Sequence, residues 1–419
     1  GGGMGAGARG APPRVDVQGG VPVLRPTMAD MRAPFEEYIE RAEPWLRESG
    51  IAKIVPPREW SPRRGGYEGL QCTIPCPIRQ HATGGRGVFR SMLIECKPLR
   101  LRGEAGGAAG FRELALKQDR ERPAGASPDE LERRFWKNVT YSPPMYGADV
   151  EASVSDEHCL GWSVPGLNTM LTRTLREKGG ARGAGVVSPY LYFGMWRSFF
   201  AWHTEDMDLY SMNMLHFGAP KTWYCVPPEH RQRFEDMAKS LAPDLFQSCS
   251  EFLRHKELLI APNILRKHGI KFVTFQQGAR EWVINYPGAY HAGFNHGYNC
   301  AESTNFATKE WIPIGLKAKH CQCRRDTVRI DMKLFTEDNP RSSGGESDSS
   351  SDTDSVSASG GAHQVGDSMK EPQKKRGSPR KNEHGCPELA KRGSKREANK
   401  VEIPRKKRTP RRSRALGAT

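Results

Sequence analysis

The sequence contains no uninterrupted run of about 18 apolar residues, the length that a membrane-spanning helix requires. Its N-terminus is rich in glycine and lacks the apolar stretch of a secretory signal peptide. The 10 cysteines among 419 residues are too sparse for a secreted disulfide scaffold, so a cysteine near a histidine indicates a metal ligand or a free thiol. No internal repeat is present. These absences argue against membrane proteins, disulfide-stapled secreted domains and repeat proteins.

Aromatic residues are nearly absent from both ends of the chain, because almost all of the 9 Trp, 16 Phe and 11 Tyr lie between residues 30 and 330. Such ends cannot bury enough apolar surface to fold, so we expect residues 1–22 and 337–419 to be disordered. The C-terminal one of these segments begins Ser-rich and acidic and ends strongly basic. The folded region is therefore expected between them.

The net charge of +16 is also uneven. Residues 368–419 hold 18 basic and 5 acidic side chains, a net charge of +13, which leaves only +3 for the other 367 residues. Two clusters, PQKKRGSPRK and PRKKRTPRRSR, are typical of nuclear-import signals and would also suit contact with DNA phosphates. We therefore expect a nuclear protein, whose tail directs import or contacts DNA without sequence preference.

Apolar spacing predicts the main elements of the folded region. Apolar residues recur at three- and four-residue spacing from Phe35 to Leu46, which predicts a helix that begins near Met28 and ends at Gly50. The run IAKI then reads as a short buried strand. Two further helices, a glycine-rich loop and a region of alternating strand-like runs are expected at 128–137, 228–243, 102–110 and 186–312.

A histidine and a glutamate in the stretch AWHTEDMDLYS point to a metal site. If this stretch is a strand, His203 and Glu205 face the same way, because side chains at i and i+2 share one face. His291, shortly after the apolar run WVINY, is the candidate for a third ligand. Two imidazoles and a carboxylate form the facial set of non-haem Fe(II) oxygenases, although other divalent metals bind the same donors. On its own the H-x-E triplet is a weak motif, and most such triplets are surface accidents.

Lys221 follows on the next predicted strand, in GAPKTWY, among aromatic residues. A dicarboxylic cosubstrate on the iron needs a cation for its far carboxylate, and a lysine provides a compact point charge. The alternative is an ordinary solvated lysine, which would be favoured if Lys221 stood alone.

Longer motifs extend this pattern: PYLYFGMW, AWHTEDMDLYSMNMLHFGAPKTWY, EFLRHK and YHAGFNHGYNCAESTNFA. Together they closely resemble the JmjN–JmjC histone lysine demethylases, specifically the lysine demethylase 4 subfamily. The segment PTMADMRAPFEEYIERAEPWLRESGIAKIVPPREW resembles the JmjN element of that family. The resemblance covers residues 23–335, with a poor fit at 97–110. Since no further Cys/His cluster or aromatic-rich region follows residue 335, we expect a short form without PHD and Tudor modules.

The resemblance implies a mainly β fold with helices, built on a double-stranded β-helix of the jelly-roll or cupin type. A zinc-bound C-terminal segment follows this barrel. The implied organisation is a JmjN element at 23–66, a mixed linking region at 67–154, a JmjC catalytic domain with the zinc site at 155–323, and a C-terminal helix at 324–336.

The resemblance also assigns cosubstrate residues. His203, Glu205 and His291 match the iron ligands, and Tyr146 and Lys221 match the groups that bind the distal carboxylate of 2-oxoglutarate. Asn213, Trp223 and Phe200 match positions around the cosubstrate, although the two aromatic residues would serve equally well as core. The positions that match the methyl-lysine pocket and the peptide contacts are Asp149, Gly185, Tyr190, Tyr192, Glu205, Lys256, Ser303, Thr304 and Asn305.

A second metal site is expected from Cys249, His255, Cys321 and Cys323. Three sulfurs and one nitrogen are enough for a closed tetrahedral zinc site, but the spacing differs from that of a zinc finger. The residues alone would equally fit packing thiols and a surface histidine. All four positions match the family's zinc ligands, which implies a site that holds the region after the barrel beside the substrate groove.

The family's reaction uses Fe(II), 2-oxoglutarate and O2 to oxidise an N-methyl group, and it releases formaldehyde and succinate. We therefore expect a monomeric, non-membrane demethylase of tri- and dimethylated lysine on the histone H3 tail. The pair Ser303–Thr304 resembles members that accept both lysine nine and lysine thirty-six.

Three departures from the family pattern bear on peptide recognition: Ala184 in place of a glutamate, Gly288–Ala289 in place of Tyr-Gly, and the glycine-rich stretch 102–110. Two other functions therefore stay open. One is a catalytically weak binder of methyl-lysine. The other is a 2-oxoglutarate hydroxylase that acts on a non-histone substrate.

Overall fold

The structure is a computed structural model that describes residues 12–104, 107–178, 184–324 and 327–336. The predicted tail at 337–419 lies outside these residues. The disorder predicted for residues 1–22 is wrong for its second half, because β1 (Val15–Gln18) and β2 (Val21–Leu24) form an antiparallel hairpin. Gly19 and Gly20 have φ of 59° and 81°, and two such residues make the tight turn that suits a β-hairpin.

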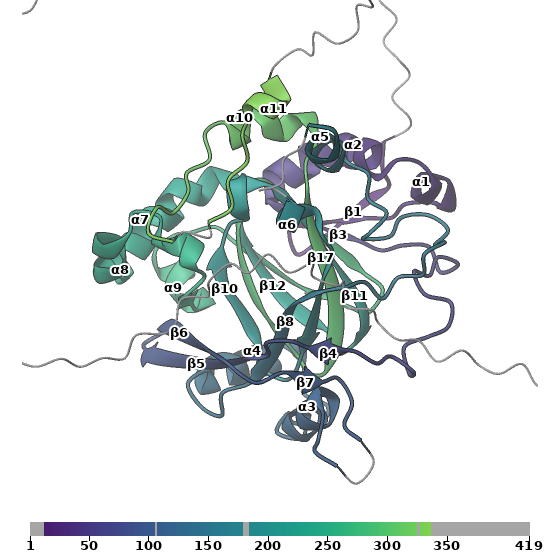
Figure 1. The fold of residues 1–419 in the computed structure, drawn as a ribbon. Coiled ribbons are helices and arrows are strands. Elements are labelled where there is room, and N and C mark those ends of the chain that lie inside the picture. The colour runs from purple at the N-terminus through teal and green to yellow at the C-terminus, as the bar shows by residue number, and fades with distance from the viewer. Residues whose placement is uncertain (1–11, 105–106, 179–183, 325–326, 337–419) are drawn as a thin grey trace, which may run out of the picture. The chain divides into compact units, whose positions relative to one another are not determined.

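The fold is mainly β, as predicted, and is built from two large sheets (Figure 1). Within the described residues one sheet has eleven strands in the order β1-β2-β3-β15-β11-β17-β9-β8-β5-β6-β13. The other has the order β10-β16-β12-β14, and a short pair, β4-β7, stands apart. Further strand bounds are β3 Ile51–Ile54, β4 Thr73–Ile74, β5 Ile78–Gly85, β6 Val88–Glu95, β7 Leu99–Arg100, β8 Met145–Glu151, β9 Tyr190–Gly194, β10 Phe199–His203, β11 Tyr210–Gly218, β12 Lys221–Val226, β13 Leu258–Ile260, β14 Val273–Gln277, β15 Trp282–Asn285, β16 Tyr290–Asn295 and β17 Asn299–Phe306.

The N-terminal element consists of the β1–β2 hairpin, two helices and β3, and it extends the larger sheet. The predicted single helix is two, α1 (Met28–Arg32) and α2 (Phe35–Ser49), because Pro34 forces the preceding Ala33 into an extended conformation with ψ of 164°. Gly50 ends α2 in the left-handed region with φ of 77°, as its position predicts. β3 then pairs in parallel with β2 and antiparallel with β15.

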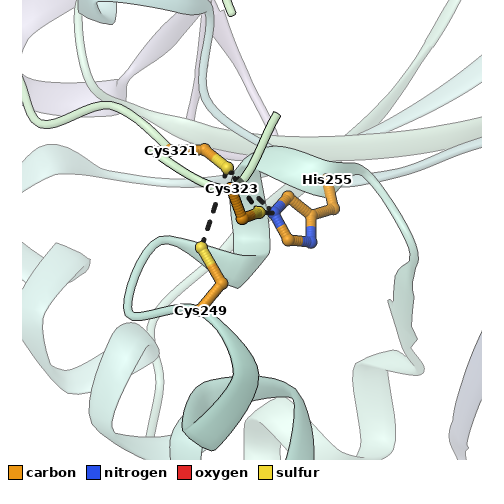
Figure 2. A group of neighbouring side chains, drawn as sticks. All are labelled: Cys249, His255, Cys321 and Cys323. Carbon is orange, nitrogen blue, oxygen red and sulfur yellow. Dashed lines mark hydrogen bonds between the residues drawn. The ribbon is translucent and has the colours of Figure 1, made fainter. Parts of the chain in front are cut away.

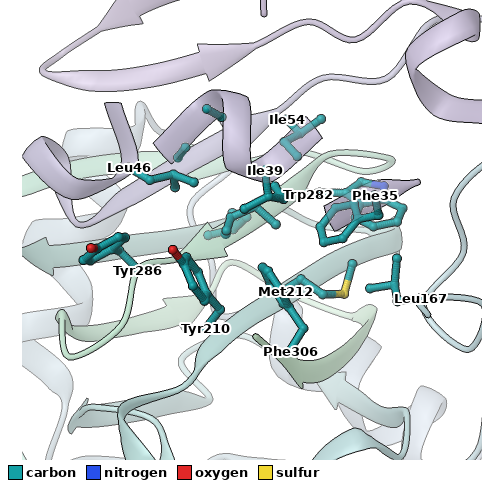
Figure 3. Close-up of a cluster of buried hydrophobic side chains, with 14 of the residues drawn as sticks. Phe35, Ile39, Leu46, Ile54, Leu167, Tyr210, Met212, Trp282, Tyr286 and Phe306 are labelled. Atoms are coloured by element: carbon teal, nitrogen blue, oxygen red, sulfur yellow. The ribbon is translucent and has the colours of Figure 1, made fainter. Parts of the chain in front are cut away.

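Helix α2 packs on the larger sheet through one apolar face (Figure 3). Phe35, at the start of that face, contacts Trp282 and Phe306, with ring centroids 6.0 and 5.2 Å apart. The Glu43 carboxylate, on the same helix, accepts hydrogen bonds from the hydroxyls of Tyr210 and Tyr286 at 2.9 and 3.1 Å. The N-terminal element thereby stabilises the strands that carry part of the cavity described below.

Helices also cover the smaller sheet. Phe135 of α4 (Pro128–Asn138) stacks on Phe294 of β16 at a centroid distance of 4.1 Å, and Phe234 of α7 (Arg231–Leu241) packs on Trp202 of β10. Both helices are predicted by the sequence, although α7 follows the short 3-10 turn η2 (Pro228–His230) rather than beginning at residue 228. The remaining elements are α3 Phe111–Asp119, α5 Met170–Glu177, α6 Ala184–Val187, α8 Pro243–Ser248, α9 Pro262–Lys267, α10 Ile312–Gly315, α11 Lys333–Thr336, η1 Asp206–Asp208, η3 Phe252–His255 and η4 Lys309–Trp311.

The region 67–154 does more than link two domains, since β5, β6 and β8 extend the larger sheet. Gln80 of β5 joins this sheet to the smaller one: its side-chain amide donates to the Phe199 carbonyl at 2.7 Å and accepts from the Phe199 N–H at 2.9 Å. The glycine-rich stretch leads directly into α3, where the Glu113 carboxylate accepts from the N–H groups of Gly103 and Gly110.

The helix predicted over 324–336 is largely wrong. Among its described residues only Lys333–Thr336 are helical. Thr327, Val328 and Ile330 are β-branched, which disfavours helix, and the latter two pack against the hydrophobic core that also contains residues of α2. No helix in the described ranges is both long and apolar enough to cross a bilayer.

Two glycines test how closely α2 and the sheets are packed. A Cβ at Gly50 would lie 3.0 Å from Cys225 Sγ and 3.1 Å from Ala289 Cβ, whereas one at Gly66, which has φ of 67°, would meet nothing within 4 Å. We expect Gly66→Ala to cost about 1 kcal/mol of unfolding free energy from backbone strain alone. Gly50→Ala should cost about 2–4 kcal/mol, because crowding adds to that strain. Denaturant melts of both variants measure this, and equal losses would contradict it.

Candidate active site and second metal centre

His203 and His291 lie side by side on neighbouring strands of the smaller sheet. His203 ends β10 and is the direct cross-strand partner of His291 on β16, with imidazole centroids 4.3 Å apart. Glu205 follows two residues later in extended backbone, so its side chain turns to the same side. The possible ligand atoms of the three residues all lie within 4.8 Å of one another, and Glu205 Oε1 is 3.2 Å from His291 Nε2. The structure thus assembles the three residues that the sequence nominates.

Backbone carbonyls determine which imidazole nitrogens can bind a metal. Nδ1 of His203 lies 2.7 Å from the Ala201 carbonyl, and Nδ1 of His291 lies 3.1 Å from the Ala289 carbonyl. A carbonyl only accepts hydrogen bonds, so each Nδ1 carries the proton and each Nε2 presents a lone pair. Burial, together with the neighbouring His291, holds the pKa of His203 well below its usual value, which favours the neutral ligand form.

Glu205 is held as a carboxylate. Asn305 of β17 donates from Nδ2 to Glu205 Oε2 at 3.0 Å, which leaves Oε1 toward the histidines. Burial alone would raise the pKa of Glu205, but the adjacent imidazoles of His291 and His203 and the Lys256 ammonium outweigh it and hold that pKa well below its usual value. Two neutral imidazoles and one carboxylate, all on one side, fit a divalent metal with open coordination positions.

A cavity of about 330 Å³ between the two sheets contains all three of these residues. This volume is at the lower end of the range for small-molecule sites. The walls come from both sheets, and the strands of the larger sheet that contribute include β5, β6 and β8. For this reason no single stretch of sequence encodes the site. The nominated residues that line it are Tyr146, Asp149, Tyr190, Tyr192, Phe200, His203, Glu205, Asn213, Lys221, Trp223, Lys256, His291, Ser303, Thr304 and Asn305.

Lys221 is the buried cation of the cavity and is only 1% exposed. Its Nζ donates to Asn295 Oδ1 at 2.8 Å and lies 3.5 Å from the Tyr146 hydroxyl, and among the described residues no carboxylate forms an ion pair with it. Burial lowers the pKa of Lys221 to about 7. Because a buried charge without a counter-charge is costly, this position is suited to a ligand that brings an anion.

Asn213, Trp223 and Phe200 surround the same end of the cavity. Asn213 is buried, and its Oδ1 has no hydrogen-bond partner among the described residues, so it is free to bond a ligand or water. Trp223 donates from Nε1 to Gln277 Oε1 at 2.9 Å and packs on Phe200 with centroids 4.7 Å apart. Trp223 and Phe200 therefore fit both interpretations of the sequence: they pack in the core, and they also line the cavity.

The rim residues are also brought together. The Tyr192 hydroxyl donates to Asp149 Oδ1 at 2.9 Å, and Asp149 is in the left-handed region with φ of 55°. Ser303 donates to the Met212 carbonyl at 2.7 Å, and Asn213 is its cross-strand partner. Gly185 lies in α6, from which Val186 lines the cavity.

Sequence reasoning missed five polar residues that line or organise this cavity. Asn295 holds Lys221, and its own Nδ2 donates to Ser198 Oγ at 2.9 Å. Asn295 lies four residues after His291, where i and i+2 alternation on a strand points to the same face. The others are Gln80, Ser91, Ser211 and Asn285, which come from strands whose pairing with the site no local pattern indicates.

The second group of candidate ligands comes from two segments, Cys249 and His255 between β12 and β13, and Cys321 and Cys323 after α10 (Figure 2). The His255 Nε2 is 3.2 Å from both Cys321 Sγ and Cys323 Sγ, and Cys249 Sγ is 3.7 Å from Cys321 Sγ. Ligands of a tetrahedral zinc lie roughly 3.3–3.8 Å apart, given Zn–S of about 2.3 Å and Zn–N of about 2.0 Å. Burial raises the pKa of Cys321, but hydrogen bonds from Cys323, His255 and the backbone outweigh burial and lower this pKa to about 6. The cluster therefore has the donor atoms that zinc requires, and they lie close together, although Cys321 Sγ and Cys323 Sγ are only 2.9 Å apart.

Comparison with known proteins agrees with this geometry. Residues 190–306 match the family model described as JmjC domain, hydroxylase, and residues 22–56 match the jmjN domain. The chain is 47% identical over 313 residues to lysine-specific demethylase 4B of Mus musculus, 43% over 314 residues to lysine-specific demethylase 4D of Rattus norvegicus, and 43% over 311 residues to probable lysine-specific demethylase 4F of Homo sapiens.

These matches cover 74%, 75% and 74% of this chain, but only 28%, 60% and 47% of the respective relatives. The residues that match the JmjC model include His203, Glu205 and His291. The chain therefore belongs to the JmjN- and JmjC-domain family of the lysine-specific demethylase 4 proteins.

Proposed function

We propose that this chain is an Fe(II)- and 2-oxoglutarate-dependent demethylase of tri- and dimethylated lysine on the histone H3 tail, at lysine nine and at lysine thirty-six. The observation that carries the proposal is one cavity that holds both a facial set of two histidines and a glutamate, and a buried lysine without a carboxylate partner. A nuclear location follows from such a substrate and agrees with the basic clusters of the tail.

His203, Glu205 and His291 would hold the iron, which supplies the redox chemistry that activates O2 when it is bound. The chain's own residues prepare this position, because the Ala201 and Ala289 carbonyls fix the imidazole tautomers and Asn305 fixes the carboxylate.

Lys221 and Tyr146 would bind the distal carboxylate of 2-oxoglutarate. The ammonium and the phenol lie 3.5 Å apart in the wall of one cavity, and Asn295 keeps the ammonium in place. Asn213, with Trp223 and Phe200, would orient the rest of the cosubstrate and exclude water from it. A buried charge pair formed in this way is strong, because little water competes for either partner.

Oxygen atoms at the cavity rim would receive the methylated ammonium. A trimethylammonium cannot donate an N–H hydrogen bond, but its polarised methyl groups suit oxygens and aromatic faces. Tyr190, Tyr192 and Ser303 offer such atoms beside Glu205, and Asp149 orients the Tyr192 hydroxyl. The small side chains of Ser303 and Thr304 would leave room for different histone sequences.

The Cys249, His255, Cys321 and Cys323 cluster would hold a structural zinc. It would join the chain after α8 to the segment after α10, and so support the residues that follow, of which Val328 lines the cavity.

The function is tested by mass spectrometry of H3 peptides trimethylated at lysine nine or lysine thirty-six, incubated with Fe(II), 2-oxoglutarate and ascorbate. We expect stepwise loss of methyl groups together with formaldehyde. His203→Ala should reduce turnover at least about a hundredfold without a change in thermal melting, because an open metal site loses one of three ligands while the core is untouched. Stable hydroxylation without formaldehyde would favour a hydroxylase, and binding without consumption of 2-oxoglutarate would favour a reader.

Lys221→Met tests the cosubstrate assignment. We expect the KM for 2-oxoglutarate to rise roughly ten- to hundredfold, because a hydrogen bond to a charged group contributes about 1.5–3 kcal/mol. The control is Lys53→Met, since Lys53 pairs with Glu281 and does not line the cavity. Steady-state kinetics with varied 2-oxoglutarate provide the measurement, and equal KM values for the two variants would refute the role of Lys221.

Cys321→Ser tests the zinc assignment. Zinc content by elemental analysis should fall from one equivalent per chain to nearly none, and the melting temperature should drop, because structural zinc contributes folding free energy directly. Cys96→Ser removes a thiol outside the cluster and should alter neither value. If both variants retain zinc and melt together, the four-ligand site is wrong.

A further inference from the structure

The chain makes a strained turn immediately after Glu205. The short turn η1 contains Met207 and Asp208 with φ of 55° and 49°, so two consecutive non-glycine residues occupy the left-handed region. Each such residue costs about 1–2 kcal/mol in the isolated chain. Such a turn persists only where its surroundings hold it, and here it determines the position of a nominated iron ligand.

Two arginines hold this turn, and they do so differently. Arg231 donates from Nη1 to Asp208 Oδ2 at 2.8 Å, and Arg254 donates from Nη2 to Asp208 Oδ1 at 2.8 Å. Only Arg254 reaches further, since its Nη1 donates to the main-chain carbonyl of Glu205 at 2.9 Å. The Arg254 guanidinium therefore bonds to both ends of the turn, the Glu205 carbonyl and the Asp208 carboxylate. Arginine can do this because its guanidinium is forked, whereas the lysine ammonium is not.

The contacts of Arg254 are enclosed. The side chains of Arg254 and Asp208 are 6% and 4% exposed, so their ion pair is little screened by solvent. The Glu205 carbonyl also accepts from the Asp208 N–H at 2.9 Å, so Arg254 bonds to a carbonyl that is already inside the turn. Arg254 thereby closes the turn onto the residue that presents the carboxylate.

Arg254 itself comes from a rigid position. It lies in η3, after the buried residues Phe252 and Leu253 and directly before His255 of the cysteine–histidine cluster. Figure 2 shows His255 turned toward the three cysteines. In this short segment Arg254 contacts the turn after Glu205, and the next residue, His255, belongs to the cysteine–histidine cluster.

We infer that Arg254 is a positioning residue of the iron site, which fixes the Glu205 main chain and ties it to the segment that the cysteine–histidine cluster anchors. The inference rests on the proposed iron site and goes beyond it, because Arg254 is not one of the candidate ligands and does not line the cavity. Its effect on the ligand is through the backbone. A loss of this contact should weaken metal binding rather than alter the substrate pocket.

The test measures Mn(II) affinity in place of activity. Free Mn(II) is followed by its EPR signal in the presence of saturating 2-oxoglutarate, on full-length protein whose zinc content and thermal melting are recorded for the same samples. Arg254→Gln should raise the Kd for Mn(II) roughly ten- to hundredfold, the range found when a group that orients a metal ligand is removed. Arg254→Lys keeps the charge opposite Asp208 but not the fork, and should fall between wild type and Arg254→Gln.

Arg231→Gln is the control, because it removes one ion pair to the same Asp208, and one to Glu235, but no contact to Glu205. Its Kd for Mn(II) should stay within about twofold of wild type. Equal Kd values for Arg254→Gln and Arg231→Gln would overturn the inference. Loss of zinc or of cooperative melting in both Arg254 variants would overturn it too, because Arg254 would then support the fold rather than the ligand.

The same titration separates this inference from the proposed function. His203→Ala removes a ligand and should abolish tight Mn(II) binding. If His203→Ala binds Mn(II) as wild type does, the iron site itself is wrong. If His203→Ala loses binding while Arg254→Gln does not, the iron site stands and only the role of Arg254 fails.

Discussion

The direct pairing of His203 with His291 is the constraint on which the rest of the site depends. A shift of one residue in the register of β10 on β16 would turn His203 to the opposite face of the sheet, away from His291. Packing on that opposite face prevents such a shift. Phe294 stacks on Phe135 of α4, and Trp202 packs on Phe234 of α7. These aromatic residues of the smaller sheet are therefore buried against helices on the face away from the cavity. The core on one face thus fixes the metal ligands on the other.

The larger sheet forms the cavity wall opposite the histidines. Asn213 and Ser303 are cross-strand partners, as are Ser211 and Asn305, so two adjacent rows of polar side chains face the histidines across the cavity. Behind this wall lie Trp282 and helix α2 of the N-terminal element, whose position therefore affects a site that it does not touch. The two matched family segments are in this sense one folded unit.

How much could be predicted from the sequence depended on how far apart the interacting residues lie. His203 and Glu205 are two residues apart, so alternation alone predicts that they face the same way. Lys221 and the cysteine–histidine cluster needed the resemblance to a family, because isolated residues of these types are usually unremarkable. Gln80, which joins the two sheets, and Asn295, which holds Lys221, could not be assigned, since their roles arise from strand order and pairing. The helix expected at 324–336 failed because burial of β-branched residues outweighed helix formation there.

The isolated ammonium of Lys221 links the cavity to proton binding. Its pKa of about 7 lies below the ordinary lysine value of 10.5, so between these pH values the unfolded chain binds a proton that the empty cavity does not. The stability of the ligand-free protein therefore decreases as pH falls through this window, because protonation of Lys221 stabilises the unfolded chain and not the folded one. An incoming dianion reverses this effect. It supplies the missing counter-charge and draws a proton onto Lys221, so occupancy of the cavity, pH and the stability of the fold are thermodynamically coupled.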